Sequence, residues 1–316
     1  MTGDTFSGVS SLGKIFLYLA AVVLAGALAA PQAWELIHRL SPDLFGGFLG
    51  KIQGMPFHRY FSRSIQVAAL LLLLPLLRSL RIRSLRAFSL VPDPRPFRDL
   101  GVGMAAGLLC MALMIPFFLG FGACSLSPDW AATLVYALPR VAMTAVAVAV
   151  LEEFLFRGVL LGLLRQVMVP TAAVVVAAIP FTLLHFFNLP RGEEEAVAWW
   201  SGLAMLARVI TSLPPWPFFL WGLVTLFVAG LLLGWLTVRT GSLHAAMGLH
   251  GTWILGQQLF NKVSVFQSDS SALLPLIGPS QCSGAVPTGL IPLGALLLGG
   301  LLAAVLLRKR PLPEHA

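Results

Sequence analysis

Three charged side chains lie within a stretch of the sequence that is otherwise almost entirely apolar. Residues 141–164 contain Glu152, Glu153 and Arg157, and Thr144 is their one other polar residue. A carboxylate can act as a general base, and a guanidinium can hold a second carboxylate in place. The stretch is long enough for one membrane crossing, and on insertion scales a charge at its centre costs about 2.5–3.5 kcal/mol. We therefore expect the charged face to line a protein interior or a water-filled cavity.

Helical geometry separates the roles of the two carboxylates. Glu153 and Arg157 are four residues apart, in the order that favours an ion pair on one helix face. Glu152 lies about 100° around the helix from Glu153. We predict that Glu153 is the structural partner of Arg157 and that Glu152 is free for chemistry. An alternative is that the three charges only hold helices together.

Two histidines in other apolar segments are predicted to lie at the level of Glu152. His185 shares a helix face with Phe181, and His250 lies in a later segment. At a rise of about 1.5 Å per residue, Glu152, His185 and His250 lie ~20, ~24 and ~12–16 Å from the predicted cytoplasmic ends of their helices. We expect these three ionisable groups to converge. One carboxylate and two imidazoles are also a ligand set of catalytic zinc sites, although no His-Glu-x-x-His motif accompanies them here.

The surroundings of His250 favour close helix packing. Gly248 and Gly251 flank this histidine and would let a neighbouring backbone approach closely, as small residues do in membrane proteins. His244 lies nearer the start of the same segment, about 120° around the helix from His250. We expect His244 at the membrane boundary.

The composition places these groups in a membrane protein. The chain is 58% hydrophobic and 11% charged, with a mean hydropathy of +0.87, whereas soluble domains carry about 25% charged residues. We predict an all-α, polytopic membrane protein with about eight transmembrane helices, a buried polar cavity and the lipid bilayer as a partner. The net charge of +8 does not indicate nucleic acid as a partner, because the basic residues cluster beside apolar spans, as topology signals do.

The apolar segments and the basic residues between them predict a topology. The predicted spans are, in chain order, residues 15–30, 65–77, 100–122, 141–164, 169–188, 218–238, 242–259 and 289–307. Six arginines within residues 78–98 indicate a cytoplasmic loop. We therefore expect a multi-pass protein of the cell (inner) membrane, with both termini in the cytoplasm.

Some segments fit this topology less simply. Ala27-Leu28-Ala29 is similar to a signal-peptidase site, so cleavage is an alternative to the retained first helix that we expect. Residues 32–63 are interrupted by Gly and Pro, are expected at the membrane interface, and carry four basic residues on the predicted outer side, against the usual bias. Residues 189–215 are expected to form an outer loop, with Glu193, Glu194 and Glu195 in solvent.

The spans group into two parts of one integrated membrane domain. Residues 1–128 hold the first three spans, and residues 129–316 hold the remaining five with the charged groups. Three cysteines fit neither a disulfide framework nor a zinc spacing. Cys110 lies inside a span, where we expect it to pack, and Cys124 and Cys282 lie in loops on one side, where a bridge between them is an option.

These motifs together resemble a known family. Glu-Glu-x-x-x-Arg at 152–157, Phe-x-x-x-His at 181–185 and a later histidine-bearing helix look like the CAAX protease and bacteriocin-processing (CPBP, or Abi) family, which includes the Ras-converting CAAX endopeptidases. The resemblance covers roughly residues 130–260. It implies an eight-helix membrane core and hydrolysis of a peptide bond by a glutamate-activated water.

The resemblance also implies roles for single residues. Glu152 would be the catalytic base, and His185 would help to hold the water. Glu153 and Arg157 would support the site, and His250 would stand on the oxyanion side. The family usually has Asn four residues after this last histidine, whereas this chain has Ile254. The side chains that could replace the missing amide are Asn188 and Gln257.

The sequence thus favours an intramembrane endopeptidase that acts on a peptide or protein, including membrane-anchored ones, without a cofactor. The nearest rival is a zinc-dependent protease with the metal on Glu152, His185 and His250. A second rival is a transporter or scaffold that keeps the buried charges for packing or proton coupling.

Overall fold

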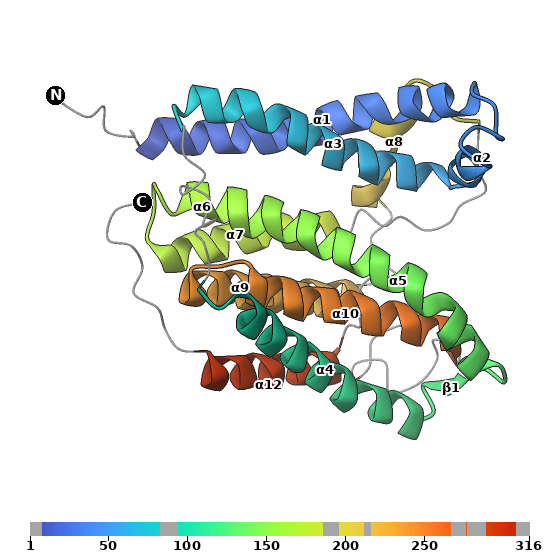
Figure 1. Cartoon of the computed structure of the whole chain (residues 1–316). Coiled ribbons are helices and arrows are strands. Elements are labelled where there is room, and N and C mark those ends of the chain that lie inside the picture. Colours follow the sequence, from blue (N-terminus) through green and yellow to red (C-terminus); the bar gives the residue numbers. More distant parts are fainter. Residues whose placement is uncertain are drawn as a thin grey trace. The chain divides into compact units, whose positions relative to one another are not determined.

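The computed structural model describes residues 8–82, 94–185, 196–211, 216–266, 276 and 289–307, and it is helical apart from one two-stranded sheet (Figure 1). Contacts along the chain divide it into two compact units. One contains residues 1–83 and 186–213, and the other contains residues 84–185 and 214–316. Long apolar segments form helices because a helix satisfies its backbone hydrogen bonds internally, as lipid requires.

The first unit is built on a pair of long helices. Its elements are α1 (Gly8–His38), α2 (Phe48–Gln53), α3 (Phe57–Ser79) and α8 (Ser201–Thr211). Helix α1 packs along α3, and α8 packs against α1. The Tyr18 hydroxyl donates to the Ala69 carbonyl at 2.7 Å, and the Lys14 ammonium donates to the Ser79 carbonyl at 2.9 Å. The two long helices are therefore antiparallel.

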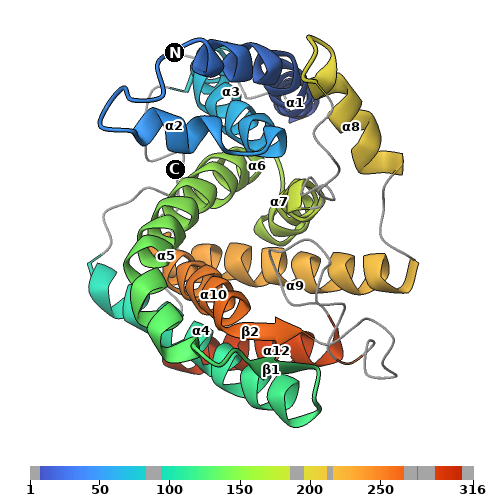
Figure 2. The same cartoon turned by 90° about the vertical axis from the view of Figure 1, so that its right-hand side faces the viewer.

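The second unit contains all the charged residues of the predicted site. Its elements are α4 (Pro96–Gly120), β1 (Cys124–Leu126), α5 (Trp130–Glu153), the π-helical segment η2 (Phe154–Leu160), α6 (Leu161–Leu164), α7 (Pro170–His185), α9 (Trp216–Thr240), α10 (His244–Val263), β2 (Ser264–Phe266) and α12 (Leu290–Leu306). Helix α10 packs against α4, α5 and α9, and Figure 2 shows it lying among them.

Glycines let α4 and α10 approach closely. A Cβ at Gly248 would clash with the Leu100 carbonyl oxygen, and one at Gly103 would clash with the Ala245 carbonyl oxygen. The predicted role of Gly248 is therefore confirmed. A Cβ at Gly251 would make only an ordinary contact, 3.5 Å from the Ala149 Cβ. Close approach thus depends on one of the two glycines that flank His250.

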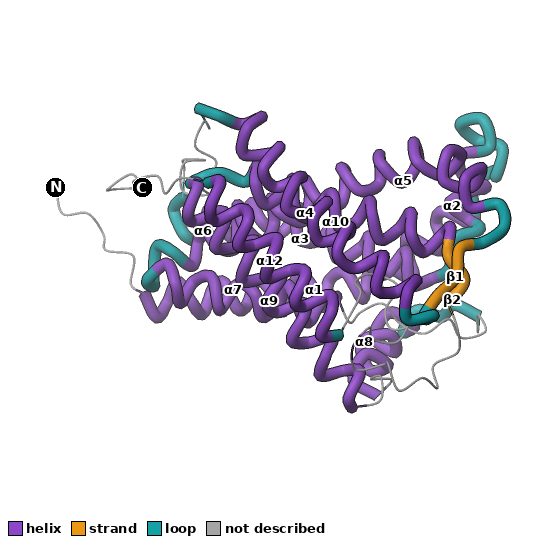
Figure 3. Tube along the Cα trace, turned by 90° about the horizontal axis from the view of Figure 1, so that it is seen from below, coloured by secondary structure: helices purple, strands orange, loops and turns teal. Residues whose placement is uncertain are grey.

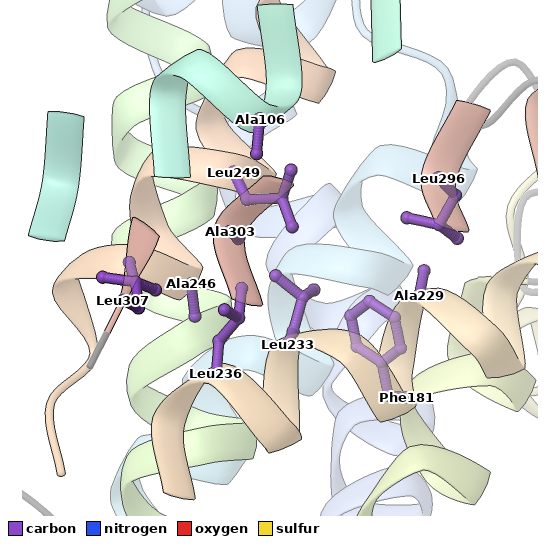
Figure 4. Close-up of a cluster of buried hydrophobic side chains, with 11 residues drawn as sticks. Ala106, Phe181, Ala229, Leu233, Leu236, Ala246, Leu249, Leu296, Ala303 and Leu307 are labelled. Atoms are coloured by element: carbon purple, nitrogen blue, oxygen red, sulfur yellow. The ribbon is translucent and has the colours of Figure 1, made fainter. Parts of the chain in front are cut away.

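Alanines and leucines fill the space between the helices of this unit. One buried cluster joins α4, α7, α9, α10 and α12, and Figure 4 shows Leu233 and Leu236 of α9 beside Ala246 of α10. Cys110 is buried in a neighbouring cluster, and its thiol donates to the Ala295 carbonyl at 3.2 Å. Packing is the role that we expected for Cys110.

A short antiparallel ribbon links two distant parts of the second unit. Strand β1 pairs with β2 so that Cys124 lies opposite Phe266 and Leu126 opposite Ser264. Figure 3 shows the two strands side by side. The Ser127 backbone N–H continues the pairing with a bond of 2.8 Å to the Val263 carbonyl. The ribbon therefore ties the chain just before α5 to the end of α10.

The expected all-α, polytopic membrane architecture is confirmed, because each of the eight predicted spans contains a helix. Five helices are long and apolar enough to cross a membrane. They comprise residues 11–38, 57–79, 96–120, 130–164 and 219–240. Helices α7 and α12 are shorter apolar helices, and α10 has 20 residues. The chain is a multi-pass membrane protein.

Two segments outside the predicted spans contain helix. Helix α1 continues to His38, where Glu35 accepts from Arg39 four residues later and His38 bonds to the Trp34 carbonyl. Residues 201–211, inside the expected outer loop, form α8, whose Gly202 and Met205 are buried. The sequence analysis did not predict these helical residues, because local side-chain pairs and one apolar face were overlooked.

The fourth span begins earlier than we predicted. Helix α5 begins at Trp130, where the Thr133 hydroxyl donates to the Asp129 carboxylate at 3.0 Å, and it continues through the exposed Arg140. A charge that reaches solvent does not end a helix, so Arg140 was a false boundary. Asn188, Glu193, Glu194, Glu195 and Cys282 lie outside the described residues.

The contacts group α4 with the C-terminal helices, since α4 packs on α10 and α12. The division of the sequence into residues 1–128 and 129–316 stays a prediction.

Candidate active site

Four helical elements of the second unit bring the predicted site residues together. The last residues of α5 supply Glu152 and Glu153, η2 supplies Arg157, the end of α7 supplies His185, and the first half of α10 supplies His250. All five residues predicted from the sequence contribute to one cluster of side chains.

Glu153 lies at the centre of a fully buried charge network. Its side chain has no exposed surface, and Oε1 accepts a hydrogen bond from the Arg157 guanidinium at 2.9 Å. The same oxygen lies 2.7 Å from Nδ1 of His250. The predicted pair of Glu153 and Arg157 is therefore confirmed. The bond to His250 was not predicted, because sequence spacing carries no information on contacts between distant helices.

Glu152 faces both imidazole rings. Its Oε2 lies 3.9 Å from Nε2 of His185 and 3.9 Å from Nε2 of His250. One ligand atom from each of the three residues lies within 4.8 Å of the others. Oε2 of Glu152 is buried, and within the described part of the chain it has no hydrogen-bond partner. The convergence expected from helix depth is therefore confirmed.

The second nitrogen of each ring fixes its tautomer. Nδ1 of His185 lies 2.7 Å from the Phe181 carbonyl, and Nδ1 of His250 lies on the Glu153 carboxylate. A carbonyl and an ionised carboxylate only accept hydrogen bonds, so both Nδ1 atoms carry a proton. In the neutral rings, both Nε2 atoms then present lone pairs toward Glu152. Such support from a second group orients imidazoles in catalytic and metal sites.

Phe181 closes one side of the cluster. Its ring centroid lies 4.5 Å from that of His185 and 5.9 Å from that of His250, and the Arg157 guanidinium carbon lies 4.0 Å from it. The shared face of Phe181 and His185 is as predicted. An aromatic ring in this position stabilises the guanidinium and separates it from the two imidazoles.

A π-helical segment begins directly after the two glutamates. In η2, residues 154–160, the backbone follows the wider π-helical path before α6 resumes the α-helix. Such segments are rare and frequently occur at functional sites. No feature of the apolar pattern in this stretch predicted it. Arg157 nevertheless reaches Glu153, because its long side chain tolerates the change of turn.

Helix α10 carries Ile254 where the family usually has an asparagine. Ile254 is partly buried on α10, and Gln257, one of the two expected substitutes, is 8% exposed on the same helix. The neighbouring Trp253 packs between the two apolar clusters of the unit. Gln257 is therefore the one proposed substitute that lies among the described residues.

His244 begins α10 and does not join the cluster of Glu152. Its Nδ1 lies 2.7 Å from the Ser242 hydroxyl, and its ring is partly buried. The expectation that it stays apart from the catalytic layer agrees with this local contact.

Comparison with protein families points to membrane-embedded peptidases. Residues 133–255 match the model of the family described as Rce1-like, type II CAAX prenyl endopeptidase. This match confirms the resemblance inferred from the motifs. The matched residues include all five residues of the candidate site. It supports a peptide hydrolase that works in the lipid bilayer. Searches of curated proteins and of solved structures found no match.

Proposed function

We propose that this protein is an intramembrane endopeptidase in which Glu152 activates a water molecule. The observation that carries the proposal is the convergence of one unpartnered carboxylate oxygen and two oriented Nε2 atoms. Separations of 3.9 Å are too long for direct hydrogen bonds and suit groups that share a water. The family match supports the peptidase class.

A water molecule bound between Glu152, His185 and His250 would have too few hydrogen atoms to donate to all three side chains. Glu152 and the two neutral Nε2 atoms are three acceptors, whereas a water molecule donates only two hydrogen bonds. The two buried carboxylates and the one guanidinium leave one negative charge uncompensated in the cluster. One proton on the cluster would neutralise this charge and supply the missing donor.

The position of His250 suits it to carry that proton. Donation from Nε2 requires protons on both ring nitrogens, and the Nδ1–H already faces the Glu153 carboxylate, which can balance the positive charge. His185 faces only the neutral Phe181 carbonyl. We therefore assign His250 to stabilise the oxyanion and His185 to accept a hydrogen bond from the water.

The reaction follows from these positions. Glu152 takes a proton from the water, and the hydroxide oxygen bonds to the carbonyl carbon of the peptide. His250 donates to the resulting oxyanion. The carbon–nitrogen bond then breaks, and Glu152 or His185 returns the proton to the leaving amine. Glu153 and Arg157 hold His250 in place and do not touch the reacting atoms.

The substrate that we propose is a peptide or protein that enters the bilayer, including membrane-anchored ones. A cleaved bond must reach a carboxylate that is 19% exposed and lies inside a membrane helix. We also propose that the protein resides in the cell membrane with both termini in the cytoplasm, because the arginines of residues 78–98 favour that orientation.

A zinc-dependent protease is the second candidate, because Glu152, His185 and His250 together form a metal ligand set. Ligand atoms about 2.0–2.2 Å from one tetrahedral ion lie about 3.4 Å apart, whereas groups that share a water at about 2.8 Å lie about 4.6 Å apart. The two separations of 3.9 Å lie between these values, slightly nearer the first, and all three ligand atoms lie within 4.8 Å of one another, so the spacing fits either occupant. A bound zinc would polarise the peptide carbonyl and acidify the water.

The test compares the peptides released from membranes that contain the wild type, Glu152→Gln or Glu35→Gln. Glu35 is an exposed carboxylate outside the cluster, so its variant controls for the loss of an acid. We expect Glu152→Gln to abolish cleavage with an unchanged melting temperature, and Glu35→Gln to retain full activity. Full activity in Glu152→Gln would reject the scheme. Loss of wild-type activity with a chelator, together with stoichiometric zinc, would select the metal candidate.

A further inference from the structure

A long apolar groove lies within the first unit, outside the charged cluster. It encloses about 490 Å³ between α1, α3 and the residues around α2. Helix α1 contributes a row of small side chains, Ala25, Ala29 and Ala33, which leave space beside α3. Figure 1 shows α1 and α3 running side by side. Because the groove follows two membrane-spanning helices, its natural contents are hydrocarbon chains.

Two arginine side chains lie at one end of the groove, whose lining itself is apolar. Arg59 and Arg63, one helical turn apart on α3, line that end and are exposed. Arg63 donates to the amide oxygen of Gln66 at 2.7 Å, which is a neutral partner. Among the described residues that line the groove, none is acidic. The occupant that complements this lining has an apolar chain and an anionic head.

Aromatic residues place the basic end at the membrane surface. The Trp34 ring stacks on His38 with centroids 3.8 Å apart, and the centroid of Tyr60 lies 6.0 Å from that of His38. Trp and Tyr are enriched where the bilayer meets water. The Tyr60 hydroxyl also donates to the Ile52 carbonyl at 2.7 Å, which fixes α2 beside the opening. Arg59 and Arg63 therefore lie at the level of lipid phosphates.

The length of the groove matches one leaflet. From Arg63 to Leu72, its last lining residue on α3, the helix rises about 14 Å. Half of a hydrocarbon core about 30 Å thick is about 15 Å. A phospholipid with its phosphate at Arg63 would extend one acyl chain along the whole groove.

We propose that the groove between α1 and α3 binds an anionic phospholipid of the surrounding bilayer, with its phosphate on Arg59 and Arg63 and one acyl chain against the alanines of α1. This site also accounts for basic residues that the topology rule does not explain. Arg59 and Arg63 lie on the predicted outer side, where Lys and Arg are usually few. Binding of a lipid phosphate gives them a reason to be there. The proposal does not depend on the peptidase mechanism.

The test uses the full-length protein in nanodiscs of phosphatidylcholine that contain a small fraction of phosphatidylglycerol with a photoreactive acyl chain. After irradiation, cross-linked peptides are mapped by mass spectrometry. We expect labelling in residues 25–37 and 60–72. We also expect much weaker labelling by a phosphatidylcholine probe with the same chain. Equal labelling by both probes would overturn the proposal, because it would indicate ordinary boundary lipid.

Variants separate the head group from the chain. The double change Arg59→Gln and Arg63→Gln should weaken labelling about 25-fold, since each basic side chain near an anionic surface contributes a factor of about five. Ala29→Phe should block the chain and remove labelling with both arginines intact. Arg78→Gln, at the other end of α3, and Ala20→Phe, on α1 outside the lining, are matched controls that should label as the wild type does. Unchanged labelling in both groove variants would refute the site.

Discussion

The arginine side chains of the charged cluster and those of the groove between α1 and α3 differ in their exposure and in their hydrogen-bond partners. The Arg157 side chain is 3% exposed and lies 2.9 Å from a fully buried carboxylate. Arg63 is exposed and donates a hydrogen bond to the neutral side-chain amide of Gln66. In the first region the protein supplies the counter-charge itself. In the second region we propose that a lipid phosphate supplies the counter-charge.

This difference indicates what each region can do. Where the chain neutralises its own guanidinium, a second carboxylate such as Glu152 is left for proton transfer. Where the chain presents guanidinium groups beside an apolar groove, it can hold a charged amphiphile but has no base for chemistry. The two proposals thus assign catalysis to the region with buried charge and binding to the region with exposed charge.

The largest effect expected from this comparison is on stability and comes from Glu153→Gln. Removing one partner of a buried pair leaves an uncompensated charge and typically costs about 3–5 kcal/mol. We expect a large drop in the melting temperature of the detergent-solubilised protein. The double change Glu153→Gln with Arg157→Met should recover most of the loss, since neither member of the pair is then left without the other. A stable single variant would show that Arg157 is not dependent on Glu153.

Two substitutions of His250 test whether Nδ1 is needed for stability and Nε2 for peptide cleavage. His250→Asn keeps a donor near the position of Nδ1, so the contact with Glu153 and the fold should persist. Peptide cleavage should fall about 10²–10³-fold because the donor at Nε2 is lost. His250→Gln keeps a donor near Nε2 and should lose less activity but more thermal stability. Equal activity in the two variants would contradict the assigned roles.

The smallest effect is expected from Arg63→Gln. Because this side chain is exposed and lies away from buried charges, the free energy of unfolding should change by no more than about 0.5 kcal/mol. Peptide cleavage should also be unchanged, measured with the substrate identified for the wild type. A loss comparable to that of Glu153→Gln would remove the distinction between the two regions.

Much of the charged cluster was predictable because it rests on local spacing and membrane depth. The four-residue separation gave the pair of Glu153 and Arg157, and the cost of charge in lipid required the polar groups to meet in the protein interior. The depth of His185 and His250 then indicated their convergence on Glu152. These inferences needed no knowledge of how the helices pack.

Other features depend on contacts that a pattern of apolar residues does not contain. The bond between His250 and Glu153 joins residues 97 positions apart. The strands β1 and β2 have three residues each and pair across a longer separation, with Cys124 opposite Phe266, so alternation could not reveal them. The π-helical segment replaces one helical form by another within a stretch that is apolar throughout except for Arg157. The sequence alone is silent on all three.

The ribbon of β1 and β2 constrains how the site can open. It holds the chain before α5 to the last turn of α10, so these two helices are fastened together at one end. If α5 and α10 move apart, the distance between them must therefore increase with distance from the ribbon. Glu152 lies on α5 about 33 Å beyond Trp130, and His250 lies on α10 about 20 Å before Val263. Small rotations at the ribbon consequently become large displacements where the peptide bond would lie.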